Sequence, residues 1–150
     1  MNLADCFPDD FKKQHFKGID LGCAILIEIP EFNIEHRKYA IYFANDKTKE
    51  GHCGLVIINS DINENVNRSD YLKSQHVLID CKRHTFLDYD SYVDCTQIHN
   101  HNLDEIIACI AENPNFLKGN VAEDVLKKIY DKILASRLIS PKDKKKYSIL

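Results

Sequence analysis

The first two thirds of the chain consist of short apolar runs separated by polar loops, a pattern typical of β-strands. In the first run Ile25, Ile27 and Ile29 fall on one side of the chain and Glu28 falls on the other. The run around Val56 is the most apolar, which favours a central, buried strand. Together these runs predict five strands, over residues 21–30, 39–44, 55–58, 75–80 and 91–96.

The spacing of apolar residues then changes to a helical period. Asn102 followed by Glu105 is typical of a capped helix start, and the same pattern recurs at Asn120 and Glu123. After the second cap a single apolar stripe predicts a long amphipathic helix. Its members are Val121, Val125, Leu126, Ile129, Tyr130, Ile133 and Leu134. We therefore expect two C-terminal helices, roughly over residues 102–138.

The two ends of the chain carry weaker signals. Pro8 and Gly18 are placed as the first-turn proline and the terminal glycine of a short helix, predicted over residues 7–18. At the other end Ser140 and Pro141 are followed by Lys-Asp-Lys-Lys-Lys. That composition predicts a solvated basic tail over residues 141–150.

Strands followed by helices, with short connections, predict an α+β fold with a mostly antiparallel sheet. About five short strands can curl into a small barrel, which removes the exposed edges of the sheet. At 150 residues the chain is expected to form a single domain, 1–150. The barrel would occupy roughly residues 20–98, followed by the two helices and the tail.

Composition narrows the classes of partner and location. A formal net charge of −3 and a pI near 6.1 argue against attraction of nucleic acid to the whole surface, but leave a local basic groove open. No apolar run approaches the roughly 20 residues of a membrane span, and the N-terminus lacks an export signal. We expect no membrane association and a cytoplasmic location. The six cysteines are then expected to be free thiols.

One group of residues raises the question of a zinc site. Cys95, His99 and His101 are close in sequence, and His52 and Cys53 could add two further ligands. Structural zinc sites usually show ligands in two closely spaced pairs, and no Cys-x-x-Cys is present here. We therefore expect no zinc, and no other cofactor.

Two groups of oxygen ligands are also ambiguous. Residues 61–67 resemble the opening of a calcium loop, but Val66 and Leu72 occupy the positions that need Gly and Glu, which favours a polar surface loop. A carboxylate cluster for metal-assisted hydrolysis is a third functional alternative, although acids around a turn are more often solvated. Its members would be Asp88, Asp90 and Asp94.

Arg37 is the basic residue with the most suggestive position. It lies with Glu35 and His36 in a polar loop between two predicted strands. A loop arginine can present its planar guanidinium to a phosphate, and a neighbouring histidine can move a proton. The alternative, a solvent-exposed arginine without a function, is equally compatible with the residue type.

The order of several motifs carries further information. An Asn-Asp pair ends the second strand, Asn59 and Ser60 follow the third, and an Asp-Ser-Tyr-Val segment runs into Gln97 and Ile98. Gly22 opens the first strand, and Gly119 precedes the last helix. Over roughly residues 20–140 this order resembles that of the MazF/PemK-like toxin family, whose members are small SH3-like barrels.

The resemblance implies a metal-independent endoribonuclease of a toxin–antitoxin pair, cleaving single-stranded RNA by attack of the 2′-hydroxyl. It also implies a homodimer that is neutralised by an acidic antitoxin segment. The catalytic Arg of the family corresponds to Arg37 and its Thr to Asn59. The proton-donating role would then pass to Ser60 or His36. We assign RNA binding to Lys38, Arg83 and His84.

Two departures from the family pattern keep a second class of function open. The Arg-Pro pair of the family is Arg37-Lys38 here, and Asn59 has no hydroxyl proton to donate. The alternative is a non-catalytic interaction protein on the same fold, such as an immunity protein, an antitoxin-like protein or a phage-encoded inhibitor. The acidic charge balance also favours that alternative.

Overall fold

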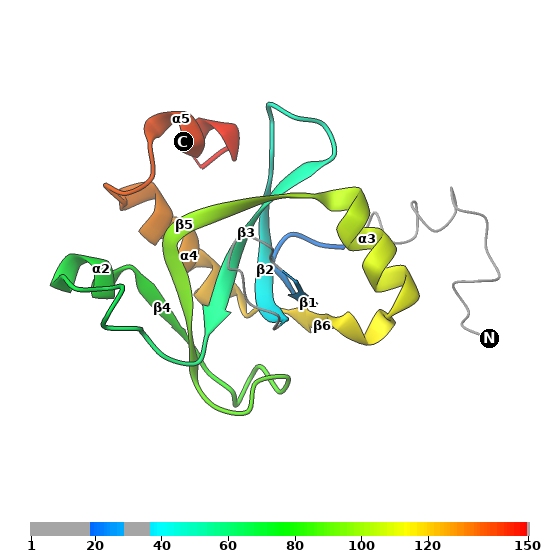
Figure 1. Ribbon diagram of the computed structural model, residues 1–150, viewed down its shortest axis with the longest axis horizontal. Coiled ribbons are helices and arrows are strands. Elements are labelled where there is room, and N and C mark those ends of the chain that lie inside the picture. The colour runs from blue at the N-terminus through cyan, green and yellow to red at the C-terminus, as the bar shows by residue number, and fades with distance from the viewer. Residues whose placement is uncertain (1–18, 29–36, 150) are drawn as a thin grey trace.

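One antiparallel sheet organises the chain. The computed structural model describes residues 19–28 and 37–149. Within them six strands form a sheet of order β4-β5-β3-β2-β1-β6, curled into a half-barrel (Figure 1). The strands are β1 (Cys23–Ile27), β2 (Lys38–Asn45), β3 (His52–Asn59), β4 (His76–Ile79), β5 (Ser91–Asn102) and β6 (Leu117–Asn120). The helices are α2 (Asp70–Ser74), α3 (Leu103–Glu112), α4 (Glu123–Ala135) and α5 (Pro141–Lys146), with a 3-10 turn η3 (Pro114–Phe116).

Helices cover both faces of this sheet. The buried stripe of α4 packs on one face through Val125, Ile129 and Ile133. The buried side of α3 packs on the other through Ile106, Ile107 and Ile110. Successive side chains of β2 point to opposite faces of the sheet. Ile41 belongs to the core under α4, and Ala40 belongs to the core under α3. Since both faces are covered, β3 is apolar at consecutive rather than alternate positions.

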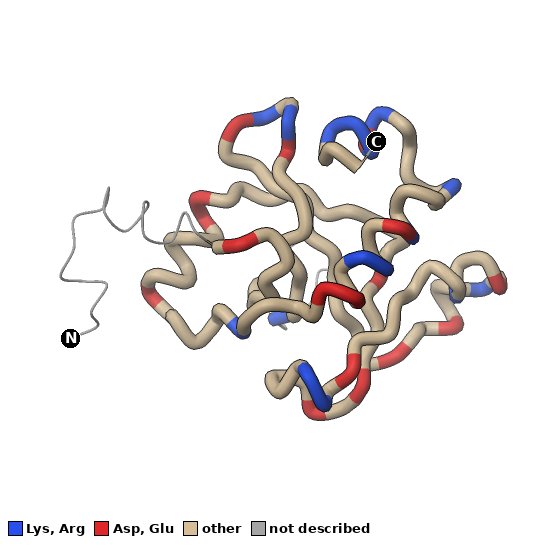
Figure 2. Tube along the Cα trace, turned by 180° about the vertical axis from the view of Figure 1, so that it is seen from behind, with Lys and Arg blue, Asp and Glu red and all other residues tan. Residues whose placement is uncertain are grey.

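Most charged residues of the described part of the chain lie in loops and helices, with basic residues interspersed among acidic ones (Figure 2). The densest basic run within a helix is Lys144, Lys145 and Lys146 in α5. This distribution agrees with the small net charge of the chain. An anionic partner would therefore have to be bound by local groups rather than by a broad charged face.

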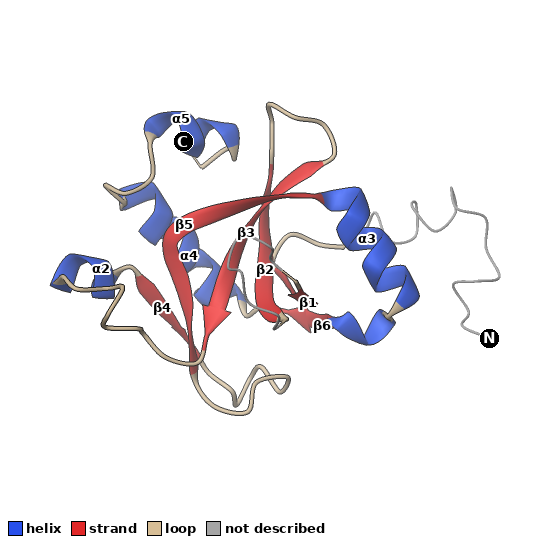
Figure 3. Cartoon of the chain, viewed as in Figure 1, coloured by secondary structure: helices blue, strands red, loops and turns tan. Residues whose placement is uncertain are grey.

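The α+β class is confirmed, and a strand lies in each of the five predicted segments, but the sheet has six strands within the described residues where about five were expected (Figure 3). β6 contains Gly119, at a φ of 109°, and Asn120, both poor strand formers, and is held in the sheet by pairing with β1. β5 also continues to Asn102 instead of ending at residue 96. The second half of β5 is polar and therefore gave no strand signal in the sequence. It is a strand because it stays paired with β3, where His101 lies opposite Cys53.

The two predicted C-terminal helices are confirmed as α3 and α4. The side chain of Asn102 accepts a hydrogen bond of 3.1 Å from the Glu105 N–H, as its position predicted. The cap predicted at Asn120 is wrong, because that residue belongs to β6 and α4 begins after Ala122. Alanine has no side-chain acceptor for the free N–H groups of the first turn.

The solvated tail predicted from residue 141 is also wrong. Those residues form α5, which starts at Pro141 after a hydrogen bond of 3.1 Å from the Asp143 N–H to the Ser140 Oγ. Tyr147 follows the helix and packs into the core beside Phe43. The predicted N-terminal helix over residues 7–18 lies outside the described residues.

Two further expectations concern the state of the cysteines and the presence of membrane spans. Cys23, Cys53 and Cys95 are free and buried, and burial raises the pKa of each thiol to about 12. Each therefore stays protonated and poorly nucleophilic at neutral pH. No helix in the described part of the chain is long and apolar enough to cross a membrane.

Candidate active site

A cavity of about 760 Å³ lies at the ends of β2 and β3, and we call it the Lys38 pocket. Its strand residues are Lys38 at the start of β2, Asn59 at the end of β3 and Asp94 within β5. The loop that follows β3 supplies the remaining described lining. Those loop residues are Ser60, Asp61, Ile62, Asn63, Glu64, Val66 and Asn67. The pocket is therefore polar and contains both a cation and several carboxylates.

Lys38 and Asn59 meet because of the register between β2 and β3. Tyr39 is paired with Ile58, which brings the first residue of one strand beside the last residue of the other. The Lys38 ammonium donates a hydrogen bond of 3.2 Å to the Asn59 Oδ1. Since the amide oxygen is used in this contact, the Asn59 NH₂ group remains available as a donor toward a ligand.

Asp94 brings a carboxylate into the same pocket and faces a histidine on the next strand. In the β4–β5 ladder Asp94 is directly opposite His76, so their side chains lie on the same face of the sheet. One carboxylate oxygen of Asp94 accepts hydrogen bonds from the backbone N–H and the hydroxyl of Thr96. These contacts orient the carboxylate and leave its second oxygen for other partners.

His76 connects the strand to the loop that covers the pocket. Its Nε2 lies 2.9 Å from the Asn67 Oδ1, and because that oxygen can only accept, Nε2 carries the proton. Nδ1 is then a lone-pair acceptor, and it is buried without a hydrogen-bond partner among the described residues. Burial lowers the pKa of His76, an effect that the charge of Asp94 partly opposes. The imidazole is therefore neutral at pH 7.

The charge balance of the Lys38 pocket is acidic. Lys38 is the only cation among its described lining residues, and it faces Asp61 and Glu64 in the loop as well as Asp94. Glu64 is 3.8 Å from the Lys73 ammonium in an exposed ion pair, which compensates little of that charge. A ligand in this pocket would thus meet its positive charge at Lys38 and negative charge around it.

Of the predicted catalytic residues, the structure brings Asn59 and Ser60 together and leaves Arg37 elsewhere. The Arg37 guanidinium lies 4.8 Å above the Phe116 ring. It lines a different cavity of about 360 Å³, together with the carboxylate residues Glu28 and Glu105. His36 lies outside the described residues. Lys38, predicted to bind RNA, lines the Lys38 pocket with Asn59 and Ser60.

Arg83 and His84 contact the start of α4 and do not line the Lys38 pocket. Arg83 forms ion pairs with Asp80 and Asp124, and these carboxylates raise the pKa of its guanidinium. His84 is 2% exposed, and both of its ring nitrogens are engaged. Its Nδ1–H donates to the Asp80 carbonyl at 2.8 Å, and its Nε2 accepts from the Ala122 N–H at 3.0 Å. His84 thus pairs the backbone N–H of Ala122, the residue that precedes α4.

No group of three or more His, Cys, Asp or Glu residues in the described part of the chain could hold a metal ion. Cys95, a residue of the zinc hypothesis, is fully buried in the core under α4. Asp90, a member of the predicted carboxylate cluster, accepts a hydrogen bond from the Cys81 N–H and thereby stabilises its turn.

Sequence reasoning missed the pairing of His76 with Asp94. Each residue precedes or interrupts an apolar run, so alternation alone could have placed both on the polar side of their strands. Which residues face one another, however, depends on the register between two strands that a long loop separates. The sequence contains no local signal for that register.

Neither a protein-family model nor a curated protein matches this chain.

Proposed function

We propose that this protein is a metal-independent endoribonuclease that cleaves single-stranded RNA from the Lys38 pocket. The observation that carries the proposal is the presence of the Lys38 ammonium, the Asn59 amide and the Asp94 carboxylate in one pocket. Cleavage by an internal hydroxyl needs a cation for the developing phosphorane charge and a base for the hydroxyl proton. Lys38 and Asp94 are groups of these two types. The half-barrel is compatible with the SH3-like barrel of MazF/PemK-like toxins, which we propose as its finer classification.

In this mechanism Asp94 accepts the proton of the 2′-hydroxyl, and the 2′-oxygen forms a bond to phosphorus. The bond from phosphorus to the 5′-oxygen breaks, and that oxygen leaves with a proton taken from solvent. Lys38 and the Asn59 NH₂ group stabilise the negative charge on the phosphoryl oxygens. Ser60 can add a hydroxyl donor at the rim. The products are a 2′,3′-cyclic phosphate and a free 5′-hydroxyl.

The test is incubation of the purified protein with single-stranded RNA in EDTA, with the ends of the fragments identified. Lys38→Met is expected to slow cleavage by about 10²–10³-fold, as for the loss of one charge-stabilising donor. Asp94→Asn is expected to slow it by about 10²–10⁴-fold, as for the loss of a general base. Lys142→Met, which removes an exposed lysine of α5, is the matched control and should leave the rate unchanged.

The variant Arg37→Ala tests which residue supplies the catalytic cation. The resemblance implies Arg37, whereas the geometry of the pocket favours Lys38. Loss of cleavage in Arg37→Ala but not in Lys38→Met would transfer the catalytic role to Arg37 and its cavity. Intact RNA after incubation with the folded wild-type protein would refute the nuclease. On the same resemblance we propose a homodimer controlled by an acidic antitoxin segment, and the mass of the purified protein in solution tests the dimer.

A non-catalytic interaction protein is the second candidate, and the acidic lining of the Lys38 pocket favours it. Asp61, Glu64 and Asp94 outnumber the single ammonium of Lys38, an arrangement that suits a basic segment of a partner protein. Such a protein would leave RNA intact and would be harmless when expressed alone. An active ribonuclease is expected to stop growth, and Lys38→Met should relieve the arrest.

A further inference from the structure

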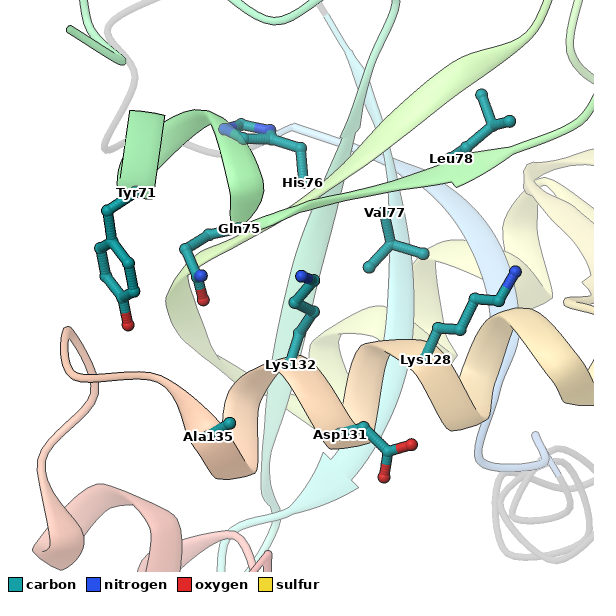
Figure 4. Close-up of a pocket in the computed structure, with 9 residues that line it drawn as sticks. All are labelled: Tyr71, Gln75, His76, Val77, Leu78, Lys128, Asp131, Lys132 and Ala135. Atoms are coloured by element: carbon teal, nitrogen blue, oxygen red, sulfur yellow. The ribbon is translucent and has the colours of Figure 1, made fainter. Parts of the chain in front are cut away.

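A second cavity, of about 500 Å³, lies between α4 and the edge strand β4, and we call it the α4 pocket (Figure 4). It exists because β4 ends the sheet and α4 runs beside it, so that no further strand fills the space. Its volume is within the range of about 300–1,000 Å³ that is usual for small-molecule sites. None of the described residues that line the Lys38 pocket also lines the α4 pocket.

Two lysines give this pocket a positive wall. Lys128 and Lys132 are one turn apart on α4, and Figure 4 shows both side chains directed from the helix toward β4, while Asp131 points away. Within the described residues, no ion pair joins either ammonium to a carboxylate. The pKa of Asp124 is lowered mainly by its hydrogen bonds with Arg83, and Lys128 adds only a minor contribution. Two adjacent ammonium groups favour a ligand with two negative charges, as on a phosphate.

The wall opposite the lysines contains a buried and incompletely bonded amide. Gln75 is 5% exposed, and its side chain enters the pocket between Tyr71 and Lys132 (Figure 4). Its Nε2 contacts the Ser74 hydroxyl at 3.1 Å, but its Oε1 is buried without a partner among the described residues. Because an unpaired buried acceptor is costly, this amide calls for a ligand that donates a hydrogen bond.

The remaining walls are apolar and fixed in place. Tyr71 accepts a hydrogen bond of 2.7 Å from the Arg137 N–H, and the Arg137 guanidinium lies 4.1 Å above its ring. Val77 points from β4 into the pocket (Figure 4). A ligand would therefore meet two cations on one side, a hydrogen-bonding amide on the other, and flat apolar surface between them.

We propose that the α4 pocket binds one nucleotide of the RNA substrate, with its phosphate on Lys128 and Lys132 and its base against Gln75. This inference rests on the proposed ribonuclease function, because the nucleotide would belong to the strand that is cleaved in the neighbouring Lys38 pocket. The two sites lie on opposite sides of the edge strand β4: His76 lines the α4 pocket, but its ring points away from α4 (Figure 4) and bonds Asn67 of the Lys38 pocket. A base offers N–H donors to the free amide oxygen and a flat ring to the apolar surface between the two polar walls.

The experiment titrates the full-length protein with the four nucleoside 5′-monophosphates, and follows binding by NMR of the Gln75 side-chain amide and by calorimetry. Lys132→Gln and Lys128→Gln should each weaken binding by about ten- to a hundredfold, as for a lost charge-assisted hydrogen bond. Lys127→Gln is the matched control, because Lys127 is exposed on α4 outside the pocket. Binding that is lost equally in the control would overturn the proposal.

Two further probes define the ligand. Inorganic phosphate should bind more weakly than the nucleotides, and Gln75→Met should remove that difference. Phosphate that binds as tightly as every nucleotide, or an acidic peptide that binds in their place, would overturn the nucleotide assignment. Nucleotide binding without any cleavage of RNA would refute the proposed function and leave the site standing. Cleavage of RNA without nucleotide binding would support the proposed function and refute the α4 pocket as a nucleotide site.

Discussion

At the scale of single residues, neighbours in sequence lie in different sites of this protein. Arg37 and Lys38 are consecutive, yet they line different cavities. Two histidines differ as clearly. His84 uses both ring nitrogens to join a loop to α4, whereas His76 has one nitrogen without a hydrogen-bond partner in the described part of the chain. A buried polar group with every bond satisfied is explained by the fold, while one with an unpaired atom points to a role beyond it.

The position of His76 predicts how RNA cleavage depends on pH. Burial holds its pKa below the ordinary value of 6.5, with Asp94 opposing the shift. While His76 is neutral, Asp94 can act as a base, and protonation would place a positive charge opposite Asp94 and weaken it. The cleavage rate is therefore expected to fall as the pH drops through a midpoint below 6.5.

The measurement is the initial rate of cleavage between about pH 5 and pH 8, the range in which a histidine of this kind titrates. His76→Gln keeps a donor for Asn67 but cannot take up a proton in this range. Its profile should lack the acidic limb that belongs to His76. A limb of the same midpoint and height in His76→Gln would show that another group is responsible.

At the scale of elements, α5 is held by a buried lysine rather than by an apolar stripe. Lys144 is 9% exposed, and its ammonium donates hydrogen bonds of 2.8 Å to the carbonyls of Leu134 and Ser136. These carbonyls belong to the end of α4, where helices leave acceptors unpaired. The lysine thus caps one helix from the next, and its charge complements the dipole of α4.

Lys144→Met tests this cap. The methionine keeps the apolar stem but leaves the two carbonyls without their donor, and the free energy of unfolding is expected to fall by about 1–3 kcal/mol. Lys145→Met, one residue along and exposed, is the matched control and should change stability by less than about 0.5 kcal/mol. Urea denaturation of the three proteins provides the measurement. Equal stability of the two variants would contradict the cap.

At the scale of the whole molecule, one buried carboxylate joins three distant segments. Asp46, which follows β2, is 7% exposed and accepts hydrogen bonds from Thr48 in the next turn and from Asn100 of β5. It also lies 3.6 Å from the ammonium of Lys146 in α5. Burial by itself would raise its pKa, but the hydrogen bonds and Lys146 outweigh that effect and lower it to about 2.

This carboxylate predicts a component of acid denaturation. A pKa lowered from 3.8 to about 2 corresponds to about 2 kcal/mol of stability, which is fully present above pH 4 and lost as the pH falls toward 2. Asp46→Asn should be less stable than wild type by a comparable amount at pH 7, and the difference should shrink in acid. Urea unfolding at several pH values, with the exposed Asp131→Asn as control, measures it. A difference that is independent of pH would contradict the assignment.

Elements of the fold were predicted correctly where the sequence signal is contained within a few neighbouring residues. The α4 stripe and the apolar run of β3 were recognised because their periodicity is complete within a few residues. The signals failed for β6, whose Gly119 and Asn120 are held by the backbone of β1, and for α5, whose composition is that of a solvated segment. In both cases a partner distant in sequence stabilises an element that its own residues would not specify.

The candidate site was predictable only in its parts. The resemblance implied Asn59 and Ser60 as catalytic residues, and Lys38 was predicted to bind RNA; these three line one pocket, while Arg37, which was grouped with them, lines another cavity. By itself, the sequence determined the segments of β1 to β5 and of the helices α3 and α4, since burial of an apolar face depends on local spacing. The tertiary structure alone decided that His76 faces Asp94 and that Lys38 reaches the same pocket. The physical reason is the register of hydrogen-bonded strands, which sets every cross-strand neighbour and is fixed by the packed sheet as a whole.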